Sequence, residues 1–289
     1  MIPKRIAIFQ NPEYDAELFY TARTARVLLE NGITPVLHED TRPRIDTSLT
    51  AIYLSHTDEM IDASDMILVL GGDGTMIDHT VRAAKKNKPA IGVNLGNLGF
   101  LTALEKDHPE ELSALARGEF TVENRMLLDA EIILDGEVLH RQRLLNDVAI
   151  ASGVRSKIAE FSIASKTGKL LEYRADGVIV ATPTGSTAYS FSAGGPVIDP
   201  TAEILSLTPI CPHSLLRRSV LLSPDTELVI TGKTRDTITD IHITMDGKNS
   251  RLVPKEAEIH IKRSPYTAKI IKIGPNRFYD ILETKLNKK

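Results

Sequence analysis

The sequence lacks the features that mark several large classes of protein. It contains one cysteine, Cys211, among 289 residues, which excludes an internal disulfide and a metal cluster built from cysteines. No apolar run approaches the roughly 18 residues of a membrane-spanning helix, and the first residues lead directly into a strand-like segment instead of a signal peptide. The formal net charge of −3 provides no basic field for a nucleic acid or a membrane surface. We therefore expect a cytoplasmic protein that has neither nucleic acid nor membrane as a partner.

The chain does contain enough material for two domains. Hydrophobic residues make up 42% and charged residues 25% of it, so a core and a soluble surface can both form. In the first third, strand-like and helix-like segments alternate, which predicts a parallel, Rossmann-like α/β sheet. We expect helices at residues 14–31 and 75–87 and strands at residues 6–9, 33–37, 66–70 and 90–93.

After about residue 122 the pattern changes to consecutive strand-like segments, which predicts a mostly β domain. Asp135 and Gly136 form the expected hairpin turn between the first two of them. A final helix-like segment, 278–286, is expected to return to the first domain, so the predicted division is 1–122 with 266–289, and 123–265. The strands are expected at residues 127–134, 138–145, 148–151, 161–164, 177–181, 228–231, 238–245, 258–261 and 267–273.

A glycine-rich turn follows the strand expected at residues 66–70. Its glycines would let a phosphate approach backbone N–H groups, and the helix expected to begin at its last residue would direct a positive end toward an anion. Parallel sheets bind ligands where their strands end in this way. The turn therefore predicts phosphate binding, with an ordinary Asp-Gly turn that has no ligand as the alternative. It consists of Gly71, Gly72, Asp73, Gly74 and Thr75.

Asp73 is the unusual member of this turn. A carboxylate beside a bound phosphate is repelled unless it holds a metal ion, caps a backbone amide or accepts a proton from an attacking hydroxyl. The last role suits a kinase, and metal ligation by Asp73 is the competing role. Because the sequence has no Walker A motif, a triphosphate would be held chiefly by the glycine-rich turn and a metal ion.

Two shorter polar segments also follow or interrupt expected strands. Residues 94–100 are rich in glycine and lie on the same sheet edge as Asp73, although an ordinary turn between a strand and a helix is the alternative. Asn146 and Asp147 lie inside the apolar segment 144–150. Two polar residues would be costly there if buried without partners, so they either cap a bulge or face a ligand.

Residues 182–196 collect hydroxyl groups, small side chains and glycines directly behind the strand expected at 177–181. Asp176 precedes that strand, and Tyr189 adds one aromatic face. Such a segment offers a tight surface, rich in hydrogen-bond donors, for the base and ribose of a nucleotide. A hydroxyl-rich loop without a ligand is the alternative, because the same residue types mark ordinary turns.

In this order and spacing, the motifs closely resemble those of the bacterial NAD kinases. The glycine-rich turn alone is shared with phosphofructokinases and with diacylglycerol and sphingosine kinases, whereas a long hydroxyl-rich segment after an Asn-acid pair is specific. The resemblance covers nearly the whole chain. It implies transfer of a phosphoryl group from ATP, or in some members from polyphosphate, to the 2′-hydroxyl of the adenosine ribose of NAD, giving NADP. It also implies a divalent cation, Mg²⁺, and a homodimer or homotetramer.

The resemblance extends to individual positions. Asp73 resembles the catalytic base, and Phe100 resembles a residue that lines the adenine region. Asn146 and Asp147 resemble the pair that holds the ribose hydroxyls of NAD, with aspartate where many members have glutamate. Asp176 resembles a residue that reaches the nicotinamide side, which can belong to a neighbouring subunit. Further ligand-binding positions are implied at Gly71, Gly72, Gly74, Thr75, Lys157, Arg174, Thr184, Thr187, Ala188, Tyr189, Ser190, Phe191 and Ser192.

One departure from the family pattern lies near the end of the chain, where Asp246, Gly247 and Lys248 stand in place of the usual Asp-Gly-Gln. Two other functions also remain open. A lipid or sugar kinase would share only the glycine-rich turn and would not explain residues 182–196. A non-catalytic NAD-sensing protein would not need Asp73. Formation of NADP from NAD, ATP and Mg²⁺ separates the three.

Overall fold

The computed structural model describes residues 2–46, 48–153, 158–213, 217–234, 240–275 and 278–287. The chain divides into two compact units, the first made of Met1–Asn124 with Ala268–Lys289 and the second of Arg125–Thr267. Each predicted boundary lies two residues before the observed one. None of the helices in the described part of the chain has the length and apolar character that a membrane crossing requires.

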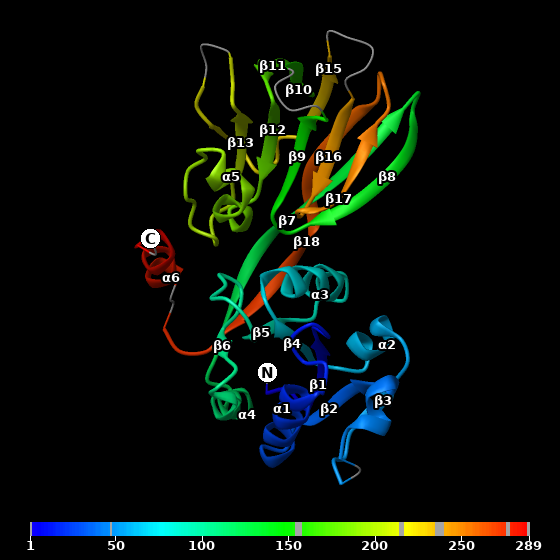
Figure 1. The fold of residues 1–289 in the computed structure, drawn as a ribbon, viewed down its shortest axis with the longest axis vertical. Coiled ribbons are helices and arrows are strands. Elements are labelled where there is room, and N and C mark those ends of the chain that lie inside the picture. The colour runs from blue at the N-terminus through cyan, green and yellow to red at the C-terminus, as the bar shows by residue number, and fades with distance from the viewer. Residues whose placement is uncertain are drawn as a thin grey trace. The chain divides into compact units, whose positions relative to one another are not determined.

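The first unit is built on a parallel sheet with the strand order β3-β2-β1-β4-β5 (Figure 1). This order reverses between β1 and β4, and a parallel α/β sheet binds its ligands at such a reversal point. The Rossmann-like prediction for this part of the chain is confirmed. The strands are β1 (Arg5–Gln10), β2 (Thr34–His38), β3 (Ile52–Leu54), β4 (Met66–Gly71) and β5 (Ala90–Asn94), with β6 (Leu104–Glu105) and the end of β18 (Glu258–Lys272) paired to β5.

Helices and short 3₁₀ segments connect these strands. Apolar side chains of β1 and β4, among them Ile6 and Leu68, pack with Leu28 of the first helix to form the core of this unit. The helices are α1 (Phe19–Glu30), α2 (Thr57–Asp62), α3 (Asp73–Lys85), α4 (Ser113–Arg117) and α6 (Phe278–Asn287), and the 3₁₀ segments are η1 (Glu39–Arg44) and η2 (Pro109–Leu112).

Both helices expected in the first third begin at a different residue than predicted. Helix α1 begins at Phe19 instead of residue 14, because the Asp15 carboxylate accepts the N–H groups of Tyr20 and Thr21 at 2.9 Å each and so caps the helix at this point. Helix α3 begins at Asp73, two residues before the predicted start. Asp73 therefore lies in the first turn of a helix and not in a loop.

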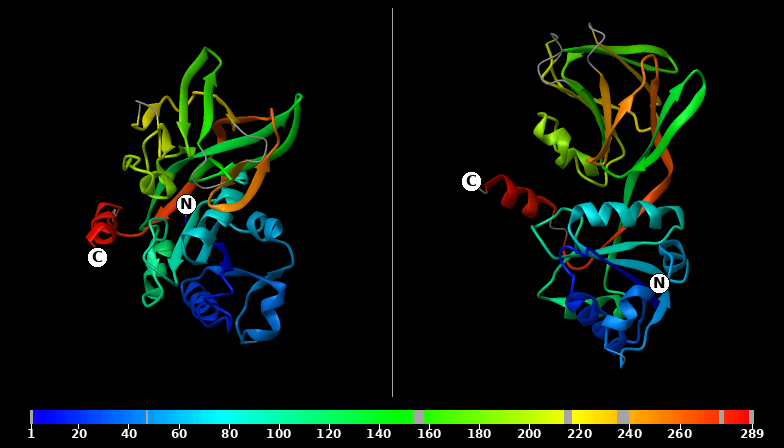
Figure 2. Two further views of the ribbon diagram at one scale, coloured as in Figure 1. Left: turned by 45° about the horizontal axis from the view of Figure 1, so that its top comes forward. Right: turned by 45° about the vertical axis from the view of Figure 1, so that its right-hand side comes forward.

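The second unit is a sandwich of two antiparallel sheets, seen from two further directions in Figure 2. Side chains such as Ile150, Phe161 and Val180 alternate inward from both sheets to form one core. One sheet contains β7 (Thr121–Leu134), β8 (Glu137–Leu144), β10 (Ala159–Ser165), β11 (Gly168–Ala175), β15 (Leu228–Lys233) and β18. The other has the order β14 (Val220–Leu222), β13 (Leu205–Ile210), β12 (Gly177–Ala181), β9 (Asp147–Ser152), β16 (Ile241–Met245), β17 (Lys248–Val253).

The mostly β prediction for this unit is confirmed, with differences in detail. Asp135 and Gly136 form the predicted hairpin turn, with φ of +52° and +82°. The two strands expected at 258–261 and 267–273 are one strand, β18, which continues through the exposed Pro265. The apolar segment 144–150 contains a bend at Leu145 and Asn146, which separates β8 from β9 close to the gap expected between the strands at 138–145 and 148–151. Strands β11, β13, β14 and β17 were not predicted.

Candidate functional site

The glycine-rich turn of the first unit lies at the reversal point of the sheet, where β1 and β4 end. Gln10 pairs with Leu70 at this edge, and the Asn11 side chain donates a hydrogen bond of 3.0 Å to the hydroxyl of Thr75. A Cβ placed on Gly72 or on Gly74 would meet no atom within 4 Å. These two glycines are therefore not required by packing, and the absence of their side chains leaves the backbone open to a ligand.

The Asp73 carboxylate holds the loop that follows β5. One of its oxygens accepts the N–H of Phe100 at 2.9 Å, and the other accepts the N–H of Leu101 at 3.1 Å. A Cβ on Gly99 would lie 2.1 Å from this carboxylate, so only glycine allows the loop to approach so closely. Of the roles considered for Asp73 from the sequence, the capping of backbone amides is seen directly. It brings the turn and residues 94–100 together, as their common sheet edge predicts.

The other groups of this loop are also fixed. The Lys272 ammonium donates to the carbonyl oxygens of Phe100 and Leu101 at 3.3 and 3.4 Å. The Phe100 ring lies 5.6 Å from the ring of Phe278, and the Lys285 ammonium lies 4.3 Å from the Phe100 ring centre. Helix α6 therefore packs against Phe100 within the first unit.

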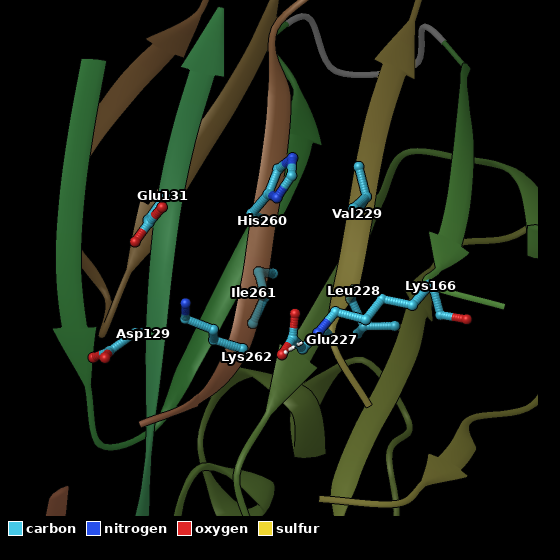
Figure 3. A pocket seen from close by; sticks show the side chains of 10 residues that line it. Asp129, Glu131, Lys166, Glu227, Leu228, Val229, His260, Ile261 and Lys262 are labelled. Carbon is cyan, nitrogen blue, oxygen red and sulfur yellow. Dashed lines mark ion pairs between the residues drawn. The ribbon is translucent and has the colours of Figure 1, made fainter. Parts of the chain in front are cut away.

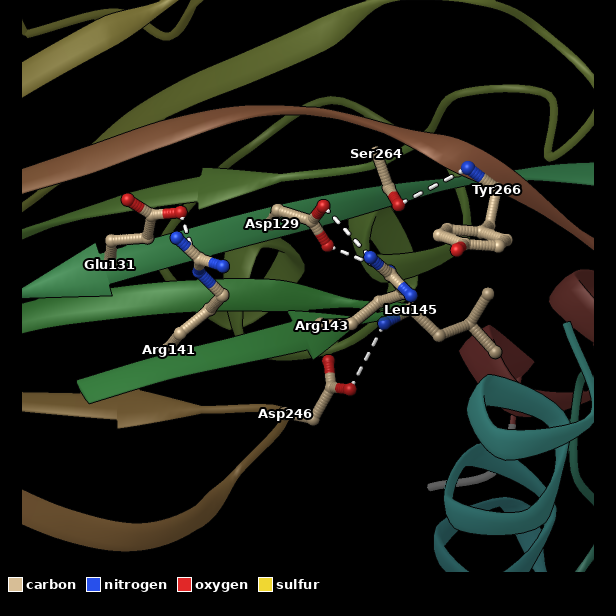
Figure 4. Close-up of polar contacts among 8 residues, drawn as sticks. All are labelled: Asp129, Glu131, Arg141, Arg143, Leu145, Asp246, Ser264 and Tyr266. Carbon is tan, nitrogen blue, oxygen red and sulfur yellow. Dashed lines mark hydrogen bonds and ion pairs between the residues drawn. The ribbon is translucent and has the colours of Figure 1, made fainter. Parts of the chain in front are cut away.

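In the second unit, Asn146 and Asp147 lie at a bend where backbone N–H groups converge on Asp246. Figure 4 shows the bond that Leu145 makes there. The Asp246 carboxylate accepts the N–H of Leu145 at 3.0 Å, of Asn146 at 2.7 Å and of Asp147 at 3.2 Å. Its own N–H donates to the Asp147 carbonyl at 2.9 Å. Asp246 and Gly247 form the turn between β16 and β17, with φ of +50° and +68°. This turn therefore anchors the bend.

The carbonyl groups of the bend are held by the start of the hydroxyl-rich segment. The Thr182 hydroxyl donates to the Leu145 carbonyl at 2.6 Å, and the Thr182 N–H donates to the Asn146 carbonyl at 2.9 Å. A Cβ on Gly185 would lie 2.1 Å from that carbonyl oxygen, so the two segments are in close contact. Asn146 and Asp147 therefore contact the start of the hydroxyl-rich segment, although the two segments lie far apart in the sequence.

Asp147 is buried, with 4% of its surface exposed. Burial, together with the charge of Asp246, raises the pKa of Asp147 to about 7, although a hydrogen bond from the Tyr189 N–H acts to lower it. Burial also raises the pKa of Asp246, while its three amide hydrogen bonds and nearby Lys248 act to lower it. Because Asp246 has these donors, Asp147 is the member of the pair that takes up a proton near neutral pH.

Residues 184–192 form a 3₁₀ segment, η3 (Thr184–Thr187), and a short helix, α5 (Tyr189–Ser192). Ala149, Ile179 and Ala181 form a small apolar cluster on the sheet face away from the sandwich core, packed with Ala193. Three side chains of the segment have different surroundings. The Ser190 hydroxyl is buried against Thr208 at 3.1 Å, whereas Tyr189 and Phe191 are 48% and 39% exposed.

The remaining predicted residues lie elsewhere. Asp176 and the exposed Arg174 precede β12, whereas residues 182–192 follow it. The strand between them has five residues at about 3.3 Å each, or about 17 Å. Within one chain, Arg174 and Asp176 are therefore separated from Asp147, which pairs with Ala181 at the far end of β12. Lys157 lies outside the described residues.

The sequence interpretation missed several residues of these sites. Asp246 was noted only as part of the triplet in which Lys248 departs from the family pattern, and no local signal links it to Asn146, which is 100 positions away. Thr182 was part of the hydroxyl-rich segment, but its contact with the bend was not predicted. Arg125, which is 97% buried and donates to the Thr184 hydroxyl at 3.5 Å, has no pattern around it that would mark it.

Two hollows lie away from the predicted residues. One, of about 210 Å³, lies on the solvent face of the first sheet of the second unit, and Figure 3 shows that Lys166 and Glu227 pair beside it. Another, of about 220 Å³, lies at the ends of β1 and β2 and is lined by His38, Arg44 and His79 among others. Within the described residues, no three His, Cys, Asp or Glu side chains gather into a group that could hold a metal ion.

Known proteins match nearly the whole chain. The family described as ATP-NAD kinase N-terminal domain matches residues 6–120, and the ATP-NAD kinase C-terminal domain matches residues 145–273. A relative from Caldanaerobacter subterraneus subsp. tengcongensis, named NAD kinase, is 37% identical over 290 residues, 99% of this chain and 100% of the relative. Another NAD kinase, from Symbiobacterium thermophilum, is 42% identical over 225 residues, 77% of this chain and 78% of the relative.

Solved structures agree in fold. Yeast NADH kinase complexed with NADH superposes with a TM-score of 0.85 at 21% identity, covering 99% of this chain and 89% of that one. An NAD kinase from Archaeoglobus fulgidus in complex with ATP gives a TM-score of 0.70 at 24% identity, covering 98% of both chains. Together with the relatives that match over nearly its full length, these findings show that the chain belongs to the NAD kinase family.

Proposed function

We propose that this protein transfers the terminal phosphoryl group of ATP to the 2′-hydroxyl of the adenosine ribose of NAD, giving NADP. Membership of the family supports the reaction. The observation in the chain itself that supports it most is the position of Asp73. Its carboxylate is held by two backbone amides beside open glycines, at the point of the sheet where ligands bind.

In this proposal Asp73 is the base that accepts the proton of the 2′-hydroxyl. The amides of Phe100 and Leu101 occupy one lone pair on each carboxylate oxygen, and the second lone pair of each can accept the hydroxyl. A carboxylate is a weak base, and a phosphoryl transfer asks for little proton removal before the transition state. Most of the rate would therefore come from holding the hydroxyl in line with the γ-phosphorus.

The second unit supplies the groups proposed to bind the nucleoside. The Asn146 amide and the Asp147 carboxyl would hold ribose hydroxyls, and both stand on a bend whose backbone groups are already satisfied. The exposed rings of Tyr189 and Phe191 offer faces on which an adenine can stack. The hydrogen bond between the Ser190 and Thr208 hydroxyls would hold the short helix that carries these two rings against the sheet.

A divalent cation, Mg²⁺, is the proposed cofactor. Mg²⁺ prefers oxygen ligands and is commonly held by one or two carboxylates together with substrate phosphates and water. The residues present fit that kind of site, since the open glycines beside Asp73 leave room for a triphosphate, whose oxygens would supply most of the cation's ligands that do not come from the protein. When bound, the cation would neutralise the charge of the triphosphate. The residues of the protein would orient the 2′-hydroxyl of NAD.

We further propose that the protein works in the cytoplasm as a homodimer or homotetramer. The separation of about 17 Å between Asp176 and the bend supports the oligomer. In this proposal Arg174 and Asp176 contact the NAD of a neighbouring subunit.

The experiment that tests the function incubates the purified protein with ATP, Mg²⁺ and NAD. NADP is then assayed with a dehydrogenase that accepts NADP alone. Formation of NADP that depends on both ATP and NAD is expected. Binding of NAD without NADP formation would favour a non-catalytic NAD-binding protein, and neither binding nor turnover would favour a lipid or sugar kinase.

A further inference from the structure

Asp246 occupies an unusual place in the second unit. It lies at the first position of a two-residue turn, yet its carboxylate points away from the turn and takes the N–H groups of three successive residues, 145–147. Figure 4 shows the Leu145 N–H directed at one of its oxygens. The residues that it binds are about 100 positions earlier in the chain. The contact therefore reflects the fold and not the local geometry of a turn.

These three N–H groups need a partner that no strand provides. At the bend between β8 and β9, Leu145 is buried and its N–H is outside the regular ladder of hydrogen bonds. A buried N–H without a partner costs on the order of 1–3 kcal/mol, and successive N–H groups that point the same way make a concave site for an anion. In this protein the Asp246 carboxylate takes the place of such an anion.

We propose that Asp246 is a positioning residue for NAD binding, which fixes the backbone at 145–147 and thereby the directions of the Asn146 and Asp147 side chains. The proposal rests on the proposed function, in which those two side chains hold the ribose. Thr182 binds the carbonyl groups of the same bend, so Asp246 and Thr182 together determine its conformation from two sides.

The backbone at Asp246 decides which variants give a clean test. With φ of +50°, this position favours aspartate, asparagine or glycine, and any other side chain would add strain. Asp246→Asn keeps the turn but has only one side-chain oxygen for the three N–H groups. An amide NH₂, which cannot accept a hydrogen bond, takes the place of the other oxygen. Asp246→Gly keeps the turn and removes the acceptor altogether.

Asp135 provides a matched control. It occupies the same position in the turn between β7 and β8, with φ of +52° and a glycine of φ +82° after it, and it is exposed to solvent. Asp135→Asn and Asp135→Gly therefore make the same chemical change at the same kind of turn in the same unit, away from the bend.

Calorimetry measures the NAD dissociation constant of each folded variant, and steady-state kinetics measures KM for NAD and for ATP. We expect Asp246→Gly to raise the dissociation constant for NAD at least tenfold and Asp246→Asn at least threefold, with KM for ATP changed less than twofold. The Asp135 variants should stay within twofold of wild type. Lower melting temperatures with an unchanged NAD dissociation constant would overturn the proposal, because a merely structural role predicts that result. If Asp246→Gly does not fold, Asp246→Asn decides by the same criterion.

Amide hydrogen exchange tests the geometry without any ligand. The N–H groups of residues 145–147 should exchange at least tenfold faster in Asp246→Gly than in wild type, and at the wild-type rate in Asp135→Gly. Unchanged exchange at the bend would overturn the proposal whatever the kinase assay shows. Failure of the wild-type protein to form NADP is a separate result, and it would overturn the proposed function.

Discussion

Replacing Asp147 with asparagine should stabilise the protein at high pH more than at low pH. The pKa of this carboxyl rises from 3.8 to about 7 on folding, because it is buried and lies near Asp246. The folded state therefore binds the proton more tightly than the unfolded state. As the pH rises from about 4 to about 7, the unfolded chain gains a solvated carboxylate first, and the free energy of unfolding falls.

The size of the effect follows from the two pKa values. One pKa unit corresponds to about 1.4 kcal/mol, and between about pH 5 and about pH 8 this single group costs wild type about 2.5 kcal/mol of stability. Asparagine cannot take a charge, but its carbonyl oxygen can still accept the Tyr189 N–H. The advantage of Asp147→Asn over wild type should therefore grow by up to about 2.5 kcal/mol across that interval.

Urea unfolding at the two pH values measures the difference. Because the chain has no tryptophan, circular dichroism is a better probe than intrinsic fluorescence. Glu137→Gln, which removes an exposed carboxylate from the same unit, serves as the control and should show no such growth. An advantage of Asp147→Asn that is the same at both pH values would refute the reasoning, since it would show that the carboxyl does not change its protonation on folding.

Three further predictions concern the proposed reaction. Asp73→Asn should lower turnover at least ~100-fold while NAD affinity changes far less, and a variant that keeps more than a tenth of wild-type turnover would remove Asp73 as the base. Asp147→Ala should weaken NAD binding by roughly 1.5–3 kcal/mol at about pH 8, where the carboxyl is ionised, as expected for hydrogen bonds to a charged group; calorimetry with unchanged affinity but a collapsed melting temperature would indicate a structural cap instead. Mixing inactive Asp73→Asn with inactive Asp176→Ala should restore some activity if subunits share a site, and no recovery despite proven subunit exchange would count against sharing.

The elements that could be predicted from sequence are those whose cause is local. Strand β4 is an uninterrupted apolar run that ends in glycines, and both its position and the importance of the turn after it follow from that pattern. The turn at Asp135 and Gly136 is a two-residue signal for a hairpin. Helix α3 was predicted two residues late, because its N-terminal cap is Gly72, which has no side chain to mark it.

The parts that could not be predicted depend on contacts between distant residues. Nothing near Asp73 shows that its carboxylate will take two amides from a loop 27 and 28 positions later, although Gly99 is the residue that makes room for it. In the same way, the sequence around Asn146 indicates two polar residues in an apolar segment but not the partners that satisfy them. Whether they cap a bulge or face a ligand was left open. The structure shows hydrogen bonds to their backbone N–H groups and to the Asn146 carbonyl, and ligand binding by their side chains stays a proposal.

The bend at Leu145 and Asn146 also bears on the order in which the second unit folds. Its backbone is held by Thr182, 37 positions away from Leu145, and by Asp246, about 100 positions away. Closing such long loops costs entropy that local contacts cannot offset, so these bonds form late in folding. A partly folded chain in which β16 has not yet paired with β9 lacks the ordered bend that is proposed to bind the ribose. Affinity for NAD therefore reports completion of the whole unit, and bound NAD stabilises only the finished fold.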